Sequence, residues 1–179
     1  YFINENIGFA SREHNEIFRT TDAGETWVKN SSIHAIYDFH FLDENTGFMT
    51  GEYGATYKTT DGGITWNPIL FQNGIIVPTS MYGIYFHDSN VGYATGFRGQ
   101  IIKTNDGGNT WTQYAETYND FNQLQFINNS TGYAQSGNDI YKTTNGGDSW
   151  SLVGSIDPSS YVTVTGFTFV NENLGYAAA

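Results

Sequence analysis

Three aspartates occupy the same place in three copies of one short motif. The motif is Thr-x-Asp-x-Gly-x-x-Trp, and its aspartates are Asp22, Asp61 and Asp106. A carboxylate beside a glycine can bind a metal ion, act as a general acid or base, or accept hydrogen bonds from its own turn. A catalytic residue is needed once in a protein, whereas these aspartates recur at equivalent positions. We therefore interpret them as turn-forming residues.

The fourth copy of the motif keeps the spacing but loses the charge. It has Asn145 where the other copies have aspartate, so an acceptor oxygen is retained. The four motifs contain all four tryptophans of the chain, which lie 39, 45 and 39 residues apart: Trp27, Trp66, Trp111 and Trp150. We expect each tryptophan to return along an outer strand and to bury its ring against the turn.

A repeat of about 40 residues surrounds these motifs. Each tryptophan follows a phenylalanine by 24 or 25 residues, and a glycine followed by an aromatic residue comes six residues after that phenylalanine. The phenylalanines are Phe2, Phe41, Phe86 and Phe126, and a fifth copy begins at Phe169. Regular spacing over the whole chain indicates a repeat architecture rather than a single layered core.

Each repeat has the pattern of short strands. Residues 36–41 alternate, which predicts a strand with Ile36, Asp38 and His40 on one face. Turns rich in Asx and glycine follow at 43–47, 51–54 and 61–63, and they separate three further extended runs. Four short antiparallel strands per repeat are typical of a β-propeller blade. A β-sandwich with coincidental spacing is the alternative.

We therefore predict an all-β fold, a β-propeller of four-stranded antiparallel blades. The chain accounts for about four and a half blades of a larger ring. We expect residues 1–179 to be a single propeller region and a piece of a longer chain. The expected repeats are approximately residues 1–30, 31–70, 71–114, 115–154 and, in part, 155–179.

The tryptophan motif resembles the Asp box, also called the BNR repeat. The upstream Asn-x-Gly-aromatic turn and the Lys-Thr-Thr-Asp-Gly-Gly run make the wider unit similar to photosystem II stability/assembly factor-like propellers. Many of those are secreted bacterial proteins, and the resemblance covers essentially the whole chain. It implies the fold but leaves the activity open, because Asp boxes also occur in sialidases, xyloglucanases and sortilin-type receptors.

Residue counts weigh against a sialidase and leave a glycan hydrolase open. A sialidase needs an arginine cluster, but the chain has only Arg12, Arg19 and Arg98, and Arg19 shares its repeat position with lysines. A xyloglucanase-like hydrolase needs two opposed carboxylates. The acidic residues that break the repeat pattern are Asp38, Glu52, Glu116, Asp120 and Asp139. The four histidines, His14, His34, His40 and His87, lack metal-ligand spacing, so we predict no metal and no cofactor.

Composition narrows the partners. The net charge is −11, from 7 basic and 18 acidic residues, which opposes binding to nucleic acid or to an anionic membrane. No apolar run is long enough for a transmembrane helix, so we predict no membrane insertion. Few lysines with abundant Asn, Thr, Gly and Tyr suggest an extracellular protein, secreted or attached to the cell surface.

Length variation is confined to one edge of the expected blades. The distance from each tryptophan to the next phenylalanine is 14, 20, 15 and 19 residues, whereas the distance from phenylalanine to tryptophan barely changes. Loops on a rigid scaffold carry binding residues. We define the variable face as the inter-blade connections and the turns between second and third strands. Its candidate binding residues are Arg12, His14, Tyr53, Phe97, Arg98, Tyr114, Tyr118 and Asp120, with His34, Phe71, Tyr82, Asn138 and Tyr161 nearby in the pattern.

We interpret the chain as a non-enzymatic binding or scaffolding module that contacts another surface protein or a glycan through the variable face. One alternative is a fragment of a xyloglucanase-like polysaccharide hydrolase. Another is an assembly-factor-like chaperone, which rests on the resemblance.

Overall fold

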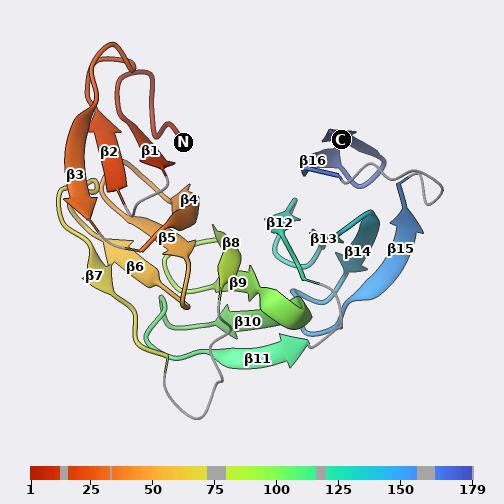
Figure 1. Cartoon of the computed structure of the whole chain (residues 1–179). Coiled ribbons are helices and arrows are strands. Elements are labelled where there is room, and N and C mark those ends of the chain that lie inside the picture. The colour runs from red at the N-terminus through yellow and green to blue at the C-terminus, as the bar shows by residue number, and fades with distance from the viewer. Residues whose placement is uncertain (13–15, 33, 72–79, 116–119, 157–163, 179) are drawn as a thin grey trace.

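Five antiparallel sheets follow one another around an open arc (Figure 1). The computed structural model describes residues 1–12, 16–32, 34–71, 80–115, 120–156 and 164–178, and for residues 31, 32, 114 and 115 the backbone alone. Within those residues the secondary structure is strand apart from one short 3-10 turn, η1 (Phe97–Gly99), and no helix is long and apolar enough to cross a membrane. The predicted all-β propeller fold is confirmed.

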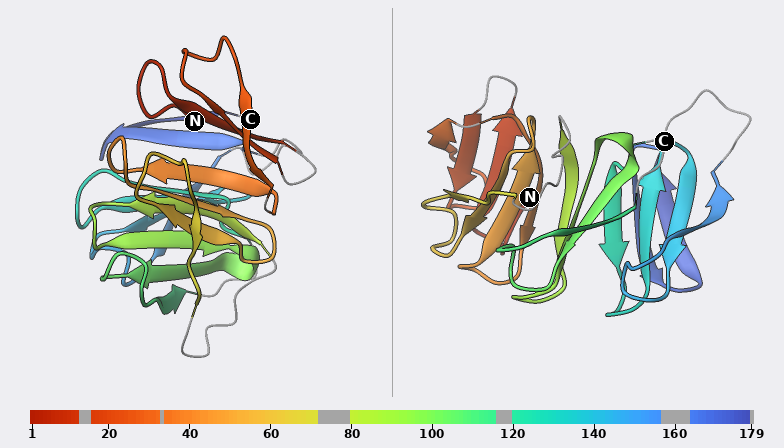
Figure 2. Two further views of the ribbon diagram at one scale, coloured as in Figure 1. Left: turned by 90° about the vertical axis from the view of Figure 1, so that its left-hand side faces the viewer. Right: turned by 90° about the horizontal axis from the view of Figure 1, so that it is seen from below.

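Each sheet is one blade, with its strands in chain order from the inside of the arc to the outside (Figures 1 and 2). The first blade has β1 (Gly8–Arg12), β2 (Glu16–Thr20) and β3 (Val28–Ser32); the second has β4 (Ile36–Phe41), β5 (Gly47–Gly51), β6 (Thr56–Thr59) and β7 (Asn67–Pro68); the third has β8 (Met81–Phe86), β9 (Gly92–Gly96), β10 (Gln100–Thr104) and β11 (Thr112–Ala115); the fourth has β12 (Gln123–Phe126), β13 (Gly132–Ser136), β14 (Asp139–Thr143) and β15 (Ser151–Ser155); the fifth has β16 (Gly166–Asn171) and β17 (Leu174–Ala178). In the first blade, a bridge between Phe2 and Gly8 marks the position of the innermost strand.

Two inner strands, β4 and β8, contain a bulge that the alternation pattern did not predict. The register between β4 and β5 shifts between Ile36 and Asp38, and β8 shifts at the equivalent place. A bulge reverses the faces on either side of it. Ile36 is therefore buried in the same cluster as Phe39 and Phe41, and the prediction that it shares a face with Asp38 and His40 is wrong.

Aromatic stacks join each blade to the next. The aromatic residue of each Gly-aromatic pair lies on a second strand, and its ring stacks on the inner-strand phenylalanine of the following blade. Phe48 stacks on Phe86 with ring centroids 3.5 Å apart, Tyr133 on Phe169 at 3.6 Å, Tyr93 on Phe126 at 4.3 Å and Phe9 on Phe41 at 5.3 Å. The hydrophobic core therefore lies between blades rather than within them.

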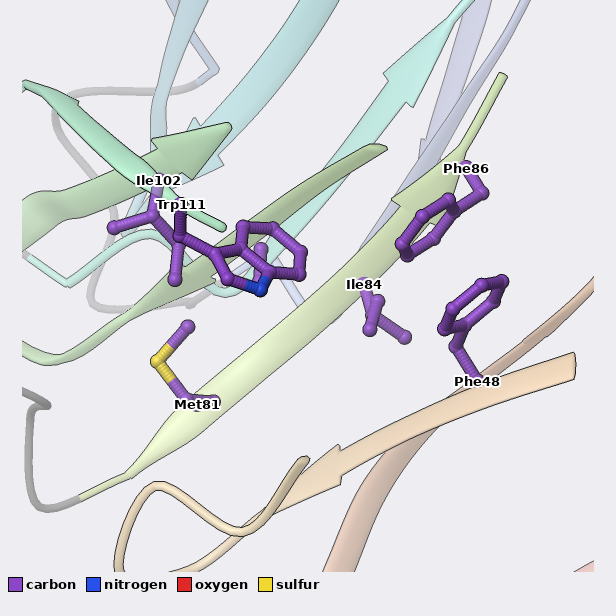
Figure 3. Close-up of a cluster of buried hydrophobic side chains, with 7 residues drawn as sticks. Phe48, Met81, Ile84, Phe86, Ile102 and Trp111 are labelled. Atoms are coloured by element: carbon purple, nitrogen blue, oxygen red, sulfur yellow. The ribbon is translucent and has the colours of Figure 1, made fainter. Parts of the chain in front are cut away.

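The glycine of each pair makes room for this stack. A Cβ atom at Gly92 would lie 2.5 Å from the ring of Phe86, which covers the glycine of its own blade. Figure 3 shows the resulting cluster between the second and third blades, in which Phe48 lies against Phe86 and near Ile84, and the buried Trp111 belongs to the same cluster. The six-residue spacing from phenylalanine to glycine follows from this contact.

The tryptophans pack edge-on against the inner-strand phenylalanine of their own blade, but their burial differs. Trp111 lies against Phe86 and is 4% exposed, because Phe71 of the preceding connection also covers it. Trp66 and Trp150 are half-buried, and Trp27 is 38% exposed. The expectation that every box buries its tryptophan is therefore correct for Trp111 and wrong for Trp27.

This gradient predicts unequal costs of truncation. We expect Trp111→Ala to lower the free energy of unfolding by about 3–5 kcal/mol, the usual cost of emptying a buried aromatic site. Trp27→Ala serves as the matched control and should cost far less, because its ring is already partly in solvent. Urea unfolding followed by tyrosine fluorescence and circular dichroism measures both, and equal losses would contradict the burial argument.

Candidate functional site

The Asp boxes use their carboxylates within their own turns. Oδ1 of Asp61 accepts hydrogen bonds from the Thr59 hydroxyl at 2.8 Å and the Thr65 backbone N–H at 2.9 Å, and Oδ2 accepts one from the Thr65 hydroxyl at 2.6 Å. These bonds, led by that from the Thr65 hydroxyl, lower the pKa of Asp61 to about 2. Asp22 and Asp106 make the same contacts. This geometry occupies the oxygens that catalysis or a metal would need.

Asn145 makes the equivalent turn without a charge. Its Oδ1 accepts hydrogen bonds from the Thr143 hydroxyl at 2.9 Å and the Ser149 N–H at 3.0 Å, and its Nδ2 donates to the Ser149 hydroxyl at 2.9 Å. The last bond runs in the opposite direction from its counterpart in the other boxes. The box geometry therefore needs an Asx acceptor but not an anion.

Basic side chains on the third strand of one blade donate hydrogen bonds to the Asp box of the next blade. In the first blade this third strand is β2. Arg19 Nε donates to the Gly62 carbonyl at 3.2 Å, Lys58 Nζ to the Gly107 carbonyl at 3.2 Å and Lys103 Nζ to the Gly146 carbonyl at 2.7 Å. Each box turn also donates a backbone hydrogen bond to the Asx turn of its own blade. Boxes, Asx turns and cations thus form one edge of the arc, the Asp-box face, whose contacts link successive blades.

The opposite edge brings tyrosines and carboxylates from three blades together. Tyr37 on β4 and Tyr82 on β8 have ring centroids 5.6 Å apart. The Tyr37 hydroxyl donates to Glu52 Oε1 at 3.3 Å. Asp120, just before β12, lies close enough to the Tyr82 hydroxyl to raise its pKa. We call these four residues the rim cluster. Ser80, just before β8, pairs with Glu52 in an isolated antiparallel bridge.

Burial and the neighbouring acids change the acidity of the two tyrosines. Desolvation first, and then the charge of Glu52, raises the pKa of Tyr37; desolvation and Asp120 do the same for Tyr82. Both hydroxyls therefore stay protonated and act as donors. Tyr37 is nevertheless 46% exposed, so its ring is available to a ligand.

Two turns beside the rim cluster hold bulky residues in left-handed backbone. Tyr53 has φ 55° and Arg98 has φ 58°, and each is followed by a glycine with positive φ. Two consecutive left-handed residues suit a tight hairpin, but that turn favours Asn or Asp at its first position. Asp120 Oδ1 accepts the Arg98 N–H at 2.7 Å, which ties the second turn to the cluster. Tyr53 is 74% exposed and Phe97 36%.

The remaining predicted residues are not part of the rim cluster. Arg12 is exposed and pairs with Glu16 at 2.7 Å, and Phe71 packs on Trp111 rather than facing solvent. His34 lies edge-on to Tyr53 with centroids 5.4 Å apart. His14, Glu116, Tyr118 and Tyr161 lie outside the described residues, as does the side chain of Tyr114.

Two acids considered for hydrolysis have structural partners. Asp38 accepts the Phe39 N–H and, across the blade boundary, the Ile84 N–H, each at 2.9 Å; burial raises its pKa to about 6. Asp139 accepts a hydrogen bond from Ser155. Among the residues that the structure describes, no three His, Asp or Glu side chains are grouped to hold a metal ion.

Sequence reasoning missed Tyr37 as a candidate site residue. The strand pattern placed it with Phe39 and Phe41, whereas the bulge in β4 frees its ring to meet Tyr82. The signal in the sequence was that Tyr37 and Tyr82 both precede an inner-strand phenylalanine by four residues.

The box geometry predicts how acid weakens the fold. The pKa of Asp22 and Asp61 in the folded chain is about 2, below the usual 3.8, and that of Asp106 is also lowered. The stability they contribute is present above about pH 4 and is lost as the pH falls toward about 2. We expect Asp22→Asn, Asp61→Asn and Asp106→Asn together, which copy the Asn145 box, to keep the fold and to reduce this loss. Thermal melts across that pH range test it, and an undiminished loss would contradict the assignment.

Comparison with known proteins supports the fold. The profile of the family described as photosynthesis system II assembly factor YCF48 matches residues 71–159, and that of the BNR/Asp-box repeat matches residues 57–68. No curated protein matches the chain.

Solved structures give the same result over most of the chain. A YCF48 structure with a bound D1 peptide is 22% identical, with a TM-score of 0.68 over 94% of this chain and 55% of its own. YCF48 from Cyanidioschyzon merolae is 18% identical, with a TM-score of 0.71 over 94% of this chain and 58% of its own. The GH74 xyloglucanase from Xanthomonas campestris is 15% identical, with a TM-score of 0.62 over 77% of this chain and 25% of its own. This chain thus spans little more than half the length of the YCF48 chains.

Motif spacing, blade topology and these matches lead to one assignment: the chain is an Asp-box (BNR) repeat β-propeller that resembles the photosystem II assembly factor-like propellers.

Proposed function

We propose that this propeller is a non-enzymatic binding module that holds a basic, extended segment of a partner protein on its rim cluster. The continuity of the cluster is the observation that carries this proposal. Tyr37, Glu52, Tyr82 and Asp120 come from the second, third and fourth blades, and successive contacts join them. A segment lying along them would meet three blades at once.

The chemistry of the cluster favours a cationic partner. Glu52 and Asp120 flank the tyrosine pair, and the whole chain carries a net charge of −11. Charge complementarity of this kind steers encounter and selects partners. The exposed rings of Tyr37, Tyr53 and Phe97 offer faces on which Lys or Arg side chains can lie.

Backbone strain at two turns supports the same face. Tyr53 and Arg98 adopt a conformation that costs a non-glycine residue free energy, and Asn would fit better there. Strained residues of this kind cluster at binding sites. Retention of a large side chain at both places is readily explained if the side chain contacts a ligand.

The related YCF48 structure with its bound D1 peptide supports a protein partner by analogy of fold. An assembly-factor-like role would use the same binding site, with an unassembled protein subunit as the partner. We also propose, from composition, that the protein acts outside the cell, on another surface protein; a glycan ligand at this face is the alternative partner.

A polysaccharide hydrolase is the second candidate function. One observation favours it: Glu52 and Asp120 both belong to the rim cluster, on a fold shared with a GH74 xyloglucanase. In that case the two acids would act across the tyrosine pair as general acid and base.

The turn residues give a test of stability against function. Because Asn tolerates the left-handed conformation, we expect Tyr53→Asn and Arg98→Asn each to raise the free energy of unfolding by about 1 kcal/mol. The same substitutions should weaken partner binding. Chemical denaturation and binding titration on the same samples measure both effects. A variant with a lower free energy of unfolding would show that the original side chain stabilises its turn, which would contradict a role in binding alone.

The binding site itself is tested with isosteric charge removal. We expect the protein to bind Lys- and Arg-containing peptides on a peptide array, and the double variant Glu52→Gln with Asp120→Asn to weaken that binding by about tenfold or more. The control, Glu25→Gln with Asp139→Asn, removes the same charge from the Asp-box face and from a different turn. It should bind as the wild type does.

Other outcomes would replace this proposal. If the control variant bound the peptides as weakly as the double variant, the loss of binding would be due to net charge and not to the rim cluster. Hydrolysis of a β-glucan that is lost with Glu52→Gln or Asp120→Asn would establish the hydrolase instead.

A further inference from the structure

A pocket of about 320 Å³ opens on the Asp-box face between the third and fourth blades. Its walls include the Asx turns and box turns of both blades, so it lies on the opposite edge from the rim cluster. Val91 and Phe126 are apolar residues of its lining, and Lys103 and Tyr93, which also line it, each donate to the Gly146 carbonyl at 2.7 Å.

Four residues that line this pocket break the repeat. His87 stands where the other four repeats have Ile3, Leu42, Ile127 and Val170. Asn105 replaces a threonine found in the other three boxes, Asn129 replaces a glutamate found in three other repeats, and Asn145 replaces the box aspartate. Contacts between blades explain the residues that recur, but they do not explain these four exceptions. All four exceptions line the same pocket.

The departures change the chemistry in one direction. Each adds at least one hydrogen-bond donor to its position, because an aliphatic side chain and a carboxylate have none and a threonine hydroxyl has one fewer than an amide. The amides of Asn105 and Asn129 are exposed and make no side-chain hydrogen bond with the residues that the structure describes. His87 Nδ1 is buried without a hydrogen-bond partner in the same part of the chain.

An unpaired buried nitrogen is costly when a leucine could fill the position. Leu42, at the equivalent position, instead packs against a hydrophobic cluster. The imidazole is therefore poorly explained by packing.

We propose that this pocket binds one residue of a sugar through adjacent hydroxyl groups. The amides of Asn105 and Asn129 each place a donor beside an acceptor, which matches neighbouring hydroxyls that also do both. The pocket volume is at the lower end of the range for small-molecule sites, which suits a single ring. Val91 and Phe126 supply apolar contact for the C–H groups. This site is separate from the rim cluster, and its ligand is independent of the proposed partner protein.

The chain's own repeats provide the test. In the repeat-restored variant, His87→Leu and Asn129→Glu install the residues of the second repeat, Leu42 and Glu44. This variant should fold and melt at least as well as the wild type, because it removes an unpaired buried nitrogen. The control, Ala23→Gly, restores the first box to the sequence of the others at a residue with φ 60°, away from the pocket.

Saturation-transfer NMR with the methyl glycosides of glucose, galactose, mannose and xylose measures binding of a free sugar. Immobilised oligosaccharides that end in the same sugars measure binding of a glycan chain. We expect at least one sugar to bind wild type and control alike, and the repeat-restored variant to bind it about tenfold or more weakly. Failure of all four sugars to bind wild type at tens of millimolar, or unchanged binding by a folded repeat-restored variant, would overturn the proposal.

Discussion

Every blade of this propeller depends on an aromatic stack with the blade beside it. A ring on the second strand of one blade meets the inner-strand phenylalanine of the next, most closely for Phe48 on Phe86. The phenylalanine also lies over the glycine of its own blade and against its own tryptophan. One phenylalanine thus makes three contacts and accounts for two constant spacings, to the glycine and to the tryptophan. The hydrophobic clusters lie between blades because one repeat cannot bury its apolar face alone.

The two edges of the arc have different roles in this arrangement. On the Asp-box face, Asx turns, boxes and the cations of third strands repeat because each of them holds the next blade, as Lys58 holds the Gly107 carbonyl. The opposite edge has no such duty at every blade, so its residues differ from one blade to the next. The rim cluster arises there, and the pocket lined by His87 arises where the repeat on the Asp-box face is itself broken.

The repeat predicted much of this structure, because it reflects contacts made identically in every blade. Blade topology, the tryptophan before each outer strand and the scaffold position of Arg19 all followed from spacing. The bulge in β4 did not, because an extra residue in a strand leaves no mark on composition. The burial of Trp111 depends on Phe71 from a connection of variable length, and the pairing of Tyr37 with Tyr82 depends on blades packing at a fixed distance. Contacts peculiar to one pair of blades are the ones that a repeat cannot predict.

Hydrogen exchange read by mass spectrometry tests most directly whether the two edges have these separate roles. With a bound basic peptide, we expect slower exchange in segments 34–38, 52–55, 80–83 and 97–101, at the rim cluster and its turns. Segments 20–26 and 59–65, in the Asp boxes, should exchange as they do in the free protein. Protection confined to the box segments would contradict the account, because it would place the partner on the edge that we assign to holding the blades together.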